Sequence, residues 1–274
     1  MLNFDNKIVV ITGASSGIGA ALAMGALKNG AKVAVCARSM DKLTLAYKEI
    51  SNDKILLYKA DVSKEADCAS FIKAVEEKWG RVDVLINNAG ISMRALFEEV
   101  NLSVIKELMD VNFWGTVYCT KFALDSILKN KGVIVGVSSI AGYRGLPART
   151  GYSASKFAIQ GFLEALRTEL LHTGTHVMWV CPGFTSSNIR NVARAADGDS
   201  QGETPLEEGK LMSAEACAEI IWDAVTKRKR SVVMTGQGKL TVWLNRFFAG
   251  FADKKVYEHF LKESGSPLLK YEAK

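Results

Sequence analysis

Tyr152, Lys156 and Ser139 are the residues whose types and spacing best suit proton transfer. On a helix, positions four apart share one face, so the phenol of Tyr152 and the ammonium of Lys156 would lie side by side. A cation about 4 Å away, at an effective dielectric of ~20, would lower the pKa of a phenol by up to about three units, toward neutral pH. We therefore predict an acid–base tyrosine. Taken in isolation, however, the pair is better explained by a packed tyrosine beside a lysine that keeps its charge in solvent.

A glycine-rich turn near the N-terminus has the composition of a dinucleotide site. It follows an apolar run, opens an apolar helical segment, and reads Gly13, Ala14, Ser15, Ser16, Gly17, Ile18 and Gly19. Glycines there allow a tight turn and a close approach of the backbone to a pyrophosphate. The helix N-terminus then offers free N–H groups and partial positive charge to the phosphates. No Lys-Ser/Thr pair follows, which excludes a P-loop. The alternative is a glycine turn without a ligand.

Arg38 and Ser39 follow the second apolar run, where this arrangement of strands faces the adenosine ribose. A carboxylate there binds the 2′-hydroxyl of NAD, whereas an arginine accepts the 2′-phosphate of NADP. The guanidinium of Arg38 and the hydroxyl of Ser39 both donate hydrogen bonds. This pair therefore predicts a preference for NADP(H), although Arg38 is also compatible with an ordinary surface arginine.

Apolar and helical segments alternate along the chain, which predicts an α/β fold with a doubly wound parallel sheet and helices on both faces. Buried strands are expected over Lys7–Thr12, Lys32–Ala37, Lys54–Lys59, Val82–Ile86, Gly132–Ser138, His176–Cys181 and Ser231–Thr235. Helical spacing covers Ser63–Trp79, Ser103–Asn130, Gly151–His172 and Ser213–Lys227. The polar segment 185–212 is weakly periodic and predicts a substrate lid. We expect one domain over 1–274, with the lid inside it and a C-terminal helical extension over 238–274.

Several motifs stand in the order and spacing of short-chain dehydrogenases/reductases, a family that the chain resembles over about residues 5–235. They are Thr12–Gly19, Asp61-Val62, Asn87-Asn88-Ala89-Gly90, Asn112, Ser138-Ser139, Tyr152-Ser153-Ala154-Ser155-Lys156 and Pro182-Gly183. The resemblance implies a single Rossmann domain whose seven parallel strands have the order 3-2-1-4-5-6-7. It also implies a nicotinamide cofactor and the catalytic tetrad Asn112, Ser139, Tyr152 and Lys156.

The resemblance assigns a role to each member of the tetrad. Tyr152 would protonate the carbonyl oxygen while hydride passes to the carbonyl carbon, and Ser139 would hydrogen-bond that oxygen. Lys156 would lower the pKa of Tyr152 and bind the nicotinamide ribose. Asn112 would hold a water in a proton relay, or alternatively mark an interrupted helical turn.

Further cofactor contacts are implied by the same resemblance. Asp61 would bind the adenine amino group and Val62 would support it through its backbone, while Asn88, Ala89 and Gly90 would pass close to the riboses. After Pro182 and Gly183 the family has a threonine where this chain has Ser187, so a contact of Ser187 with the carboxamide is expected. Thr185 belongs to the same predicted cofactor set.

Apolar residues are expected to border the substrate cleft and to favour a hydrophobic ketone, aldehyde or alcohol. They are Met93, Tyr143, Leu146, Phe184 and Ile189. The three histidines are neither clustered nor paired with cysteines at ligand spacing, so no metal site is expected.

Composition and charge indicate the cellular compartment of the protein and argue against nucleic acid as its ligand. No apolar run reaches the length of a spanning helix, the N-terminus shows no signal peptide, and the five cysteines are scattered; we expect a cytoplasmic protein with reduced thiols. Residues 226–274 hold 11 Lys/Arg against 4 Asp/Glu, whereas the remainder is nearly neutral. The basic excess belongs to the tail and does not indicate nucleic-acid binding.

The tail carries an apolar stripe at helical spacing, formed by Leu240, Trp243, Leu244, Phe247, Phe248 and Phe251. Basic residues border it, which leaves two interpretations open. A helix lying in a membrane interface fits the pattern. We favour packing on the domain itself or on a partner subunit, roofing part of the substrate cleft, in a homodimer or homotetramer.

These observations together predict an NADP(H)-dependent oxidoreductase that interconverts a hydrophobic carbonyl compound and its alcohol. The alternative is a non-catalytic cofactor-sensing or scaffold protein of the same fold, because fold alone does not determine function.

Overall fold

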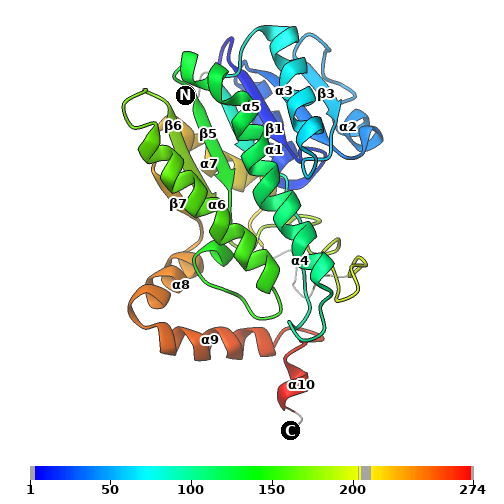
Figure 1. The fold of residues 1–274 in the computed structure, drawn as a ribbon, viewed down its shortest axis with the longest axis vertical. Coiled ribbons are helices and arrows are strands. Elements are labelled where there is room, and N and C mark those ends of the chain that lie inside the picture. Colours follow the sequence, from blue (N-terminus) through cyan, green and yellow to red (C-terminus); the bar gives the residue numbers. More distant parts are fainter. Residues whose placement is uncertain (1–3, 203, 205–210, 273–274) are drawn as a thin grey trace.

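A seven-stranded parallel sheet forms the centre of the molecule (Figure 1). The computed structural model describes residues 4–202, 204 and 211–272. Its strands are β1 (Ile8–Thr12), β2 (Lys32–Ala37), β3 (Ile55–Lys59), β4 (Val84–Asn87), β5 (Val133–Val137), β6 (His176–Cys181) and β7 (Ser231–Val233). The spatial order is β3-β2-β1-β4-β5-β6-β7, which confirms the predicted order. All seven expected strands form, and their bounds differ from the predicted ones by two residues or fewer.

Helices cover both faces of the sheet, because the central strands are apolar on both sides. Helices α3 (Glu65–Trp79), α5 (Gly115–Lys129) and α6 (Thr150–Glu169) pack on one face, and their buried side chains include Phe71, Ile127 and Leu163. Helices α1 (Gly17–Lys28), α2 (Met40–Ala46) and α7 (Ala214–Thr226) pack on the other face, around Leu22 and Trp222. All five cysteines are buried free thiols.

The segment predicted as one helix over Ser103–Asn130 is interrupted. The structure has α4 (Leu102–Leu108), a wider π-helical turn over Met109–Trp114, and then α5. Asn112 lies in this turn and is completely buried. Such a turn commonly marks a functional position in a helix.

The carboxyl ends of the strands meet at one edge of the sheet, and the chain reverses its winding direction between β1 and β4. In doubly wound sheets, ligands bind at this reversal. The first turn at that edge contains Gly13, whose φ is +65°. A Cβ added to Gly13 would lie 2.6 Å from the Cα of Ala89, so only glycine lets the β1 and β4 loops approach this closely.

The segment between β6 and α7 folds over this edge. Thr185 and Met212 form a parallel bridge at its base, and Arg194 bridges to Met93. Arg194 also donates two hydrogen bonds to Glu107, at 2.8 and 2.6 Å. Of the predicted lid, residues 203 and 205–210 lie outside the described residues.

Three helices follow the sheet: α8 (Gly236–Phe247), α9 (Ala249–Leu261) and α10 (Leu269–Glu272). The continuous stripe predicted from Leu240 to Phe251 is therefore broken, because Phe248 adopts a non-helical backbone with φ −138° and ψ 54°. In Figure 1, α8 descends from the sheet and α9 turns to run beneath the body of the molecule. Among the described residues, no helix combines the length and apolarity needed to cross a membrane.

Candidate active site

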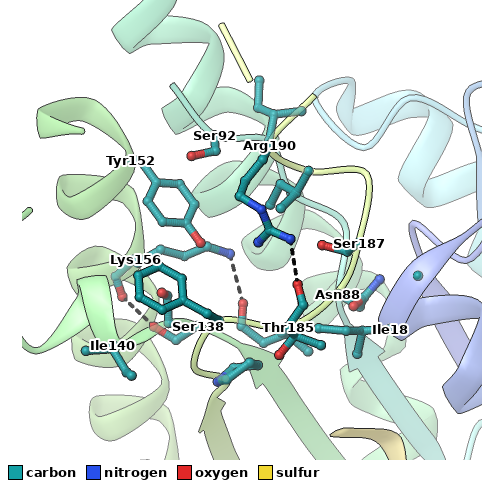
Figure 2. A pocket seen from close by; sticks show the side chains of 18 of the residues that line it. Ile18, Asn88, Ser92, Ser138, Ile140, Tyr152, Lys156, Thr185, Ser187 and Arg190 are labelled. Carbon is teal, nitrogen blue, oxygen red and sulfur yellow. Dashed lines mark hydrogen bonds between the residues drawn. The ribbon is translucent and has the colours of Figure 1, made fainter. Parts of the chain in front are cut away.

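A cavity of about 870 Å³ opens at the carboxyl edge of the sheet (Figure 2). Nearly all of the predicted cofactor residues line it. They are Gly13, Ser15, Ser16, Gly17, Ile18, Arg38, Ser39, Asp61, Val62, Asn88, Ala89, Gly90, Tyr152, Lys156, Pro182, Gly183, Thr185 and Ser187. Gly19 is buried behind them, where an added Cβ would lie 2.5 Å from the Gly13 carbonyl oxygen. The residues predicted from separate motifs thus come together in one cavity.

The turn before α1 suits a pyrophosphate. Gly17 begins the helix with φ +56°, and the Ser16 side chain makes no capping hydrogen bond. The first turn carries no acidic residue that would repel an anion. Asn88 braces the turn, because its amide donates to the carbonyl oxygens of Thr12 and Gly13 at 2.9 and 3.0 Å. The N–H groups at this helix end therefore remain available to phosphate oxygens, and the residues present fit a dinucleotide.

The end of β2 presents cations to the same cavity. Arg38 is exposed there, and Ser39 caps α2 by accepting from the Lys42 backbone N–H at 3.3 Å. This cap fixes Lys42 in the first turn of α2, four residues after Arg38, and both side chains line the cavity. Lys42 was not predicted as a cofactor-site residue, although the sequence shows the Ser-x-x-Lys spacing at the start of a helix.

Asp61 lies at the end of β3 and also faces the cavity. The backbone and hydroxyl of Ser63 both donate to one oxygen of its carboxylate, at 3.1 and 2.8 Å. These bonds fix the orientation of the Asp61 side chain at the cavity wall.

Three members of the predicted tetrad lie around the cavity, and the fourth supports them from behind. Ser139, Tyr152 and Lys156 line the cavity, whereas Asn112 does not. The Asn112 amide accepts from the Ile91 N–H at 2.8 Å and donates to the Ile91 carbonyl and to Ser155. Its backbone carbonyl accepts from the Thr116 hydroxyl at 2.8 Å. Asn112 thus ties the loop after β4 to α6, the helix that carries Tyr152.

Lys156 is buried against the end of β5. Its ammonium donates to the carbonyl oxygen of Val137 at 2.9 Å, and it lies 5.7 Å from the centre of the Tyr152 ring. Burial lowers the pKa of Lys156 to about 8. Figure 2 shows the ammonium and the phenol side by side in the cavity, as the i, i+4 spacing predicts.

The expected lowering of the Tyr152 pKa is wrong. Burial raises the pKa of Tyr152 above its ordinary value, and the hydrogen bond with Ser139 and the charges of Arg149 and Arg190 offset this only in part. The charge of Lys156 is directed to the Val137 carbonyl, so desolvation of the phenolate exceeds its effect. Tyr152 is therefore held in its protonated form.

Apolar side chains form part of the cavity wall. The predicted residues Leu146, Phe184 and Ile189 line the cavity, together with Met212 from the segment between β6 and α7. Met93 and Tyr143 are not among the lining residues. Met93 is completely buried, and the Tyr143 hydroxyl accepts from the Trp179 indole at 3.0 Å. Met93 and Tyr143 are apolar because they pack inside the protein, and a single sequence does not distinguish such residues from those that line a substrate cavity.

The C-terminal helices supply a wall that the sequence indicated only as a partial roof. Their lining residues are Gln237, Gly238, Thr241, Leu244, Ala252, Lys255, Val256, His259 and Phe260. Of the predicted apolar stripe, Leu244 lines the cavity, whereas Trp243, Phe247 and Phe248 are exposed.

Two arginines in the cavity were also missed. Arg149 lies over the Phe260 ring at 4.6 Å, and Arg190 donates to the Thr185 carbonyl at 3.0 Å. Figure 2 shows Arg190 pointing into the cavity from the segment between β6 and α7, above Thr185. Arg149 had no local signal, because the residues that hold it lie far along the chain. The described ranges contain no group of three or more His, Cys, Asp or Glu able to hold a metal ion.

Comparison with known proteins shows the family to which the chain belongs. The family model for short chain dehydrogenases matches residues 7–198. An 11-beta-hydroxysteroid dehydrogenase A from Sesamum indicum is 33% identical over 270 residues, which are 95% of this chain and 77% of that protein. The chain belongs to the short-chain dehydrogenase/reductase family and is an NAD(P)-dependent oxidoreductase.

Two solved structures show the same fold with different coenzymes. An alcohol dehydrogenase from Thermococcus sibiricus, complexed with 5-hydroxy-NADP, is 26% identical; the match has a TM-score of 0.73 and covers 83% of this chain and 95% of that one. A short-chain dehydrogenase/reductase from Burkholderia phymatum in complex with NAD is 23% identical, with a TM-score of 0.81 over 92% of this chain and 96% of that one. Either nicotinamide coenzyme is therefore compatible with the fold.

Proposed function

We propose that this oxidoreductase uses NADP(H) in preference to NAD(H). The observation that carries the proposal is the pair of cations at the end of β2, since Arg38 and Lys42 both line the cavity. No carboxylate from β2 or α2 is among the described lining residues. A 2′-phosphate would receive charge-assisted hydrogen bonds there, whereas a ribose hydroxyl would gain little from two cations.

We propose that the substrate is a hydrophobic carbonyl compound or its alcohol. Apolar side chains from the segment between β6 and α7 and from the C-terminal helices line the cavity, including Phe184, Ile189, Leu244 and Phe260, beside the cations Arg149, Arg190 and Lys255. The sesame relative is named as a hydroxysteroid dehydrogenase, which is consistent with this chemistry. A bound nicotinamide would supply or accept the hydride.

Three side chains transfer the proton and stabilise the charges that develop during the reaction. Tyr152, held protonated by burial, donates its proton to the carbonyl oxygen in the reductive direction. Ser139 lies beside Tyr152 and its hydroxyl stabilises the charge that develops on the same oxygen. Lys156, fixed to Val137, holds positive charge beside the phenol and stabilises the tyrosinate left after proton transfer.

The coenzyme preference is tested by replacing Arg38 with Ala and comparing kcat/KM for NADPH and NADH. We expect the NADPH value to fall about 10- to 150-fold, the equivalent of one charge-assisted contact, while the NADH value changes little. Lys48→Ala, a change at an exposed lysine outside the cavity, is the control. Equal losses for both coenzymes would refute the role of Arg38.

The substrate class is tested by following NADPH oxidation with carbonyl compounds matched in size but differing in polarity. Ketones with extended apolar skeletons should show the highest kcat/KM, and a preference for sugar carbonyls would contradict the proposal. Absence of turnover with every carbonyl, together with tight coenzyme binding, would favour a cofactor-sensing or scaffold role.

The homodimer or homotetramer expected from the sequence stays a prediction, which light scattering of the full chain tests.

A further inference from the structure

The turn between α8 and α9 carries an exposed apolar surface, here called the α8–α9 corner. It consists of Leu240, Trp243, Phe247, Phe248 and Phe251, which are 51 to 60% exposed. The Trp243 ring lies 5.8 Å from Phe247 and 5.5 Å from Phe248, so these side chains form one cluster. Figure 1 shows this turn at the periphery of the molecule, away from the sheet. Clustered exposed aromatic residues usually mark an interaction surface.

Basic side chains border the corner. Arg246 lies 5.8 Å from the Phe247 ring and Lys255 lies 5.8 Å from the Phe251 ring, while Lys239 and Lys254 are exposed on the same two helices. Helix α8 contains no acidic residue. In α9, Asp253 pairs with Arg144 and Glu258 pairs with Lys255 at 2.8 Å. Because Glu258 neutralises Lys255 and Asp253 is already paired with Arg144, the positive charge beside the aromatic cluster comes from Lys239, Arg246 and Lys254.

The corner is attached to the core by specific contacts on its other side. Asn245 accepts from Arg144 and donates to the Tyr143 carbonyl, both at 2.9 Å. Leu244, Val256 and Phe260 face the substrate cavity. These contacts use the inner faces of α8 and α9 and leave the aromatic residues of the outer face turned to solvent.

We propose that the α8–α9 corner docks into the interface of a lipid bilayer that contains anionic lipids. Aromatic side chains would enter the boundary between headgroups and acyl chains, and the basic border would meet the anionic headgroups. Neither helix needs to span the bilayer, because an interfacial helix lies in its plane. The wall of the substrate cavity would then lie at the membrane surface.

A second copy of this chain fits the same surface less well. A two-fold dimer brings a patch against itself. Here that would place Lys239 and Arg246 near their own counterparts, and α8 offers no carboxylate to neutralise them. Charge complementarity therefore favours an anionic surface as the occupant.

Flotation of the full chain with vesicles tests the proposal without reference to activity. We expect the protein to float with phosphatidylcholine vesicles that contain phosphatidylglycerol, and to float less with pure phosphatidylcholine or at high salt. The variant Trp243→Glu/Phe248→Glu should remain at the bottom of the gradient. Leu45→Glu/Leu171→Glu, which alters two residues that are 71% and 66% exposed elsewhere, should float like the parent.

The basic border is tested separately with Lys239→Glu/Arg246→Glu. Removing two cations from an anionic surface should weaken partitioning about 30-fold or more, since each contributes about 1 kcal/mol. The control Lys28→Glu/Lys48→Glu changes two exposed lysines on other elements and should have a smaller effect. Brominated lipids should quench the fluorescence of the parent, and most of this quenching should disappear in Trp243→Phe.

Three results would overturn the proposal. The first is a parent protein that stays unbound to vesicles containing phosphatidylglycerol. The second is equal flotation of the corner variant and its control, with both shown to be folded by circular dichroism. The third is a corner variant that changes from oligomer to monomer in light scattering while still floating, which would identify a second copy as the occupant. The conservative Trp243→Phe quenching experiment remains decisive if the glutamate variants do not fold.

Discussion

Arg149 and Glu263 are 114 residues apart in the chain, yet one terminal nitrogen of Arg149 donates to both carboxylate oxygens of Glu263, at 3.2 and 3.0 Å. Arg94 lies 3.6 Å from the same carboxylate, and the side chains of Arg94 and Glu263 are each 4% exposed. Arg149 also lines the substrate cavity and covers the Phe260 ring. The end of the C-terminal extension is thereby attached to the wall of the active site.

Glu263→Gln should destabilise the protein markedly. The change leaves two buried guanidinium groups without their shared carboxylate, and breaking such a buried network typically costs about 3–5 kcal/mol. Urea unfolding measures the loss, and KM for the carbonyl substrate should rise because Phe260 and Arg149 lose their support.

Glu258→Gln is the matched control for this experiment. Glu258 forms an exposed pair with Lys255, and exposed pairs contribute at most about 1 kcal/mol. If both variants unfold at the same urea concentration, the buried network does not stabilise the extension.

Tyr152→Phe should reduce turnover by about 10²- to 10⁴-fold, because the transferable proton is lost. Coenzyme affinity, measured by fluorescence titration, should change little, since the ring still fills its place. Tyr143→Phe removes the same atom from a tyrosine outside the cavity and should retain turnover. A Tyr152→Phe enzyme within about tenfold of the parent would contradict the assignment.

The parts of the site that the sequence predicted correctly depend on local pattern or on chain order. The spacing of Tyr152 and Lys156 places both on one face of α6, and the glycine turn follows directly from the Gly13–Gly19 spacing. Sheet order required the family resemblance, since strand runs alone do not specify which strands pair. Arg38 was found because the second strand of this fold always ends near the ribose.

The features that the sequence did not reveal depend on contacts between distant residues. Nothing near Arg149 indicates Glu263, and nothing near Met93 distinguishes a core residue from a cavity wall. The direction of the Tyr152 pKa shift was also not predictable from the sequence, because desolvation of the phenolate depends on the whole cavity rather than on the neighbouring lysine. The break at Phe248 lies within a regular apolar spacing, so periodicity predicts one helix where the structure has two.

Lys156 should make stability depend on pH. Because burial lowers its pKa to about 8, the unfolded chain binds this proton more tightly than the folded one. Stability should therefore rise as the pH increases from about 8 toward the ordinary lysine value of about 10.5. Lys156→Met should remove this pH dependence. It should also raise the free energy of unfolding at pH 7 by about 1–3 kcal/mol, which is the gain from removing a buried charge less the loss of the hydrogen bond to the Val137 carbonyl.

The measurement for Lys156 is urea unfolding of parent and variant at several pH values from 7 to about 10. Lys48→Met, at an exposed position, should reproduce the pH dependence of the parent. Turnover of Lys156→Met should be lost although its stability increases, as is common where an active site holds a buried charge. An unchanged pH dependence in Lys156→Met would show that Lys156 titrates normally.

Gly13→Ala and Gly161→Ala should have opposite effects on stability. Gly13 has φ +65° and no space beside Ala89, so the added methyl group should cost at least about 1–3 kcal/mol and weaken coenzyme binding by displacing the phosphate turn. Gly161 lies inside α6, and beyond the adjoining residues and backbone of its own helix no atom lies within 4 Å of an added Cβ, so alanine there should stabilise the helix by about 0.5–1 kcal/mol. Thermal unfolding and coenzyme titration of both variants check this contrast, and a Gly13→Ala protein that binds coenzyme like the parent would show that the turn tolerates a side chain.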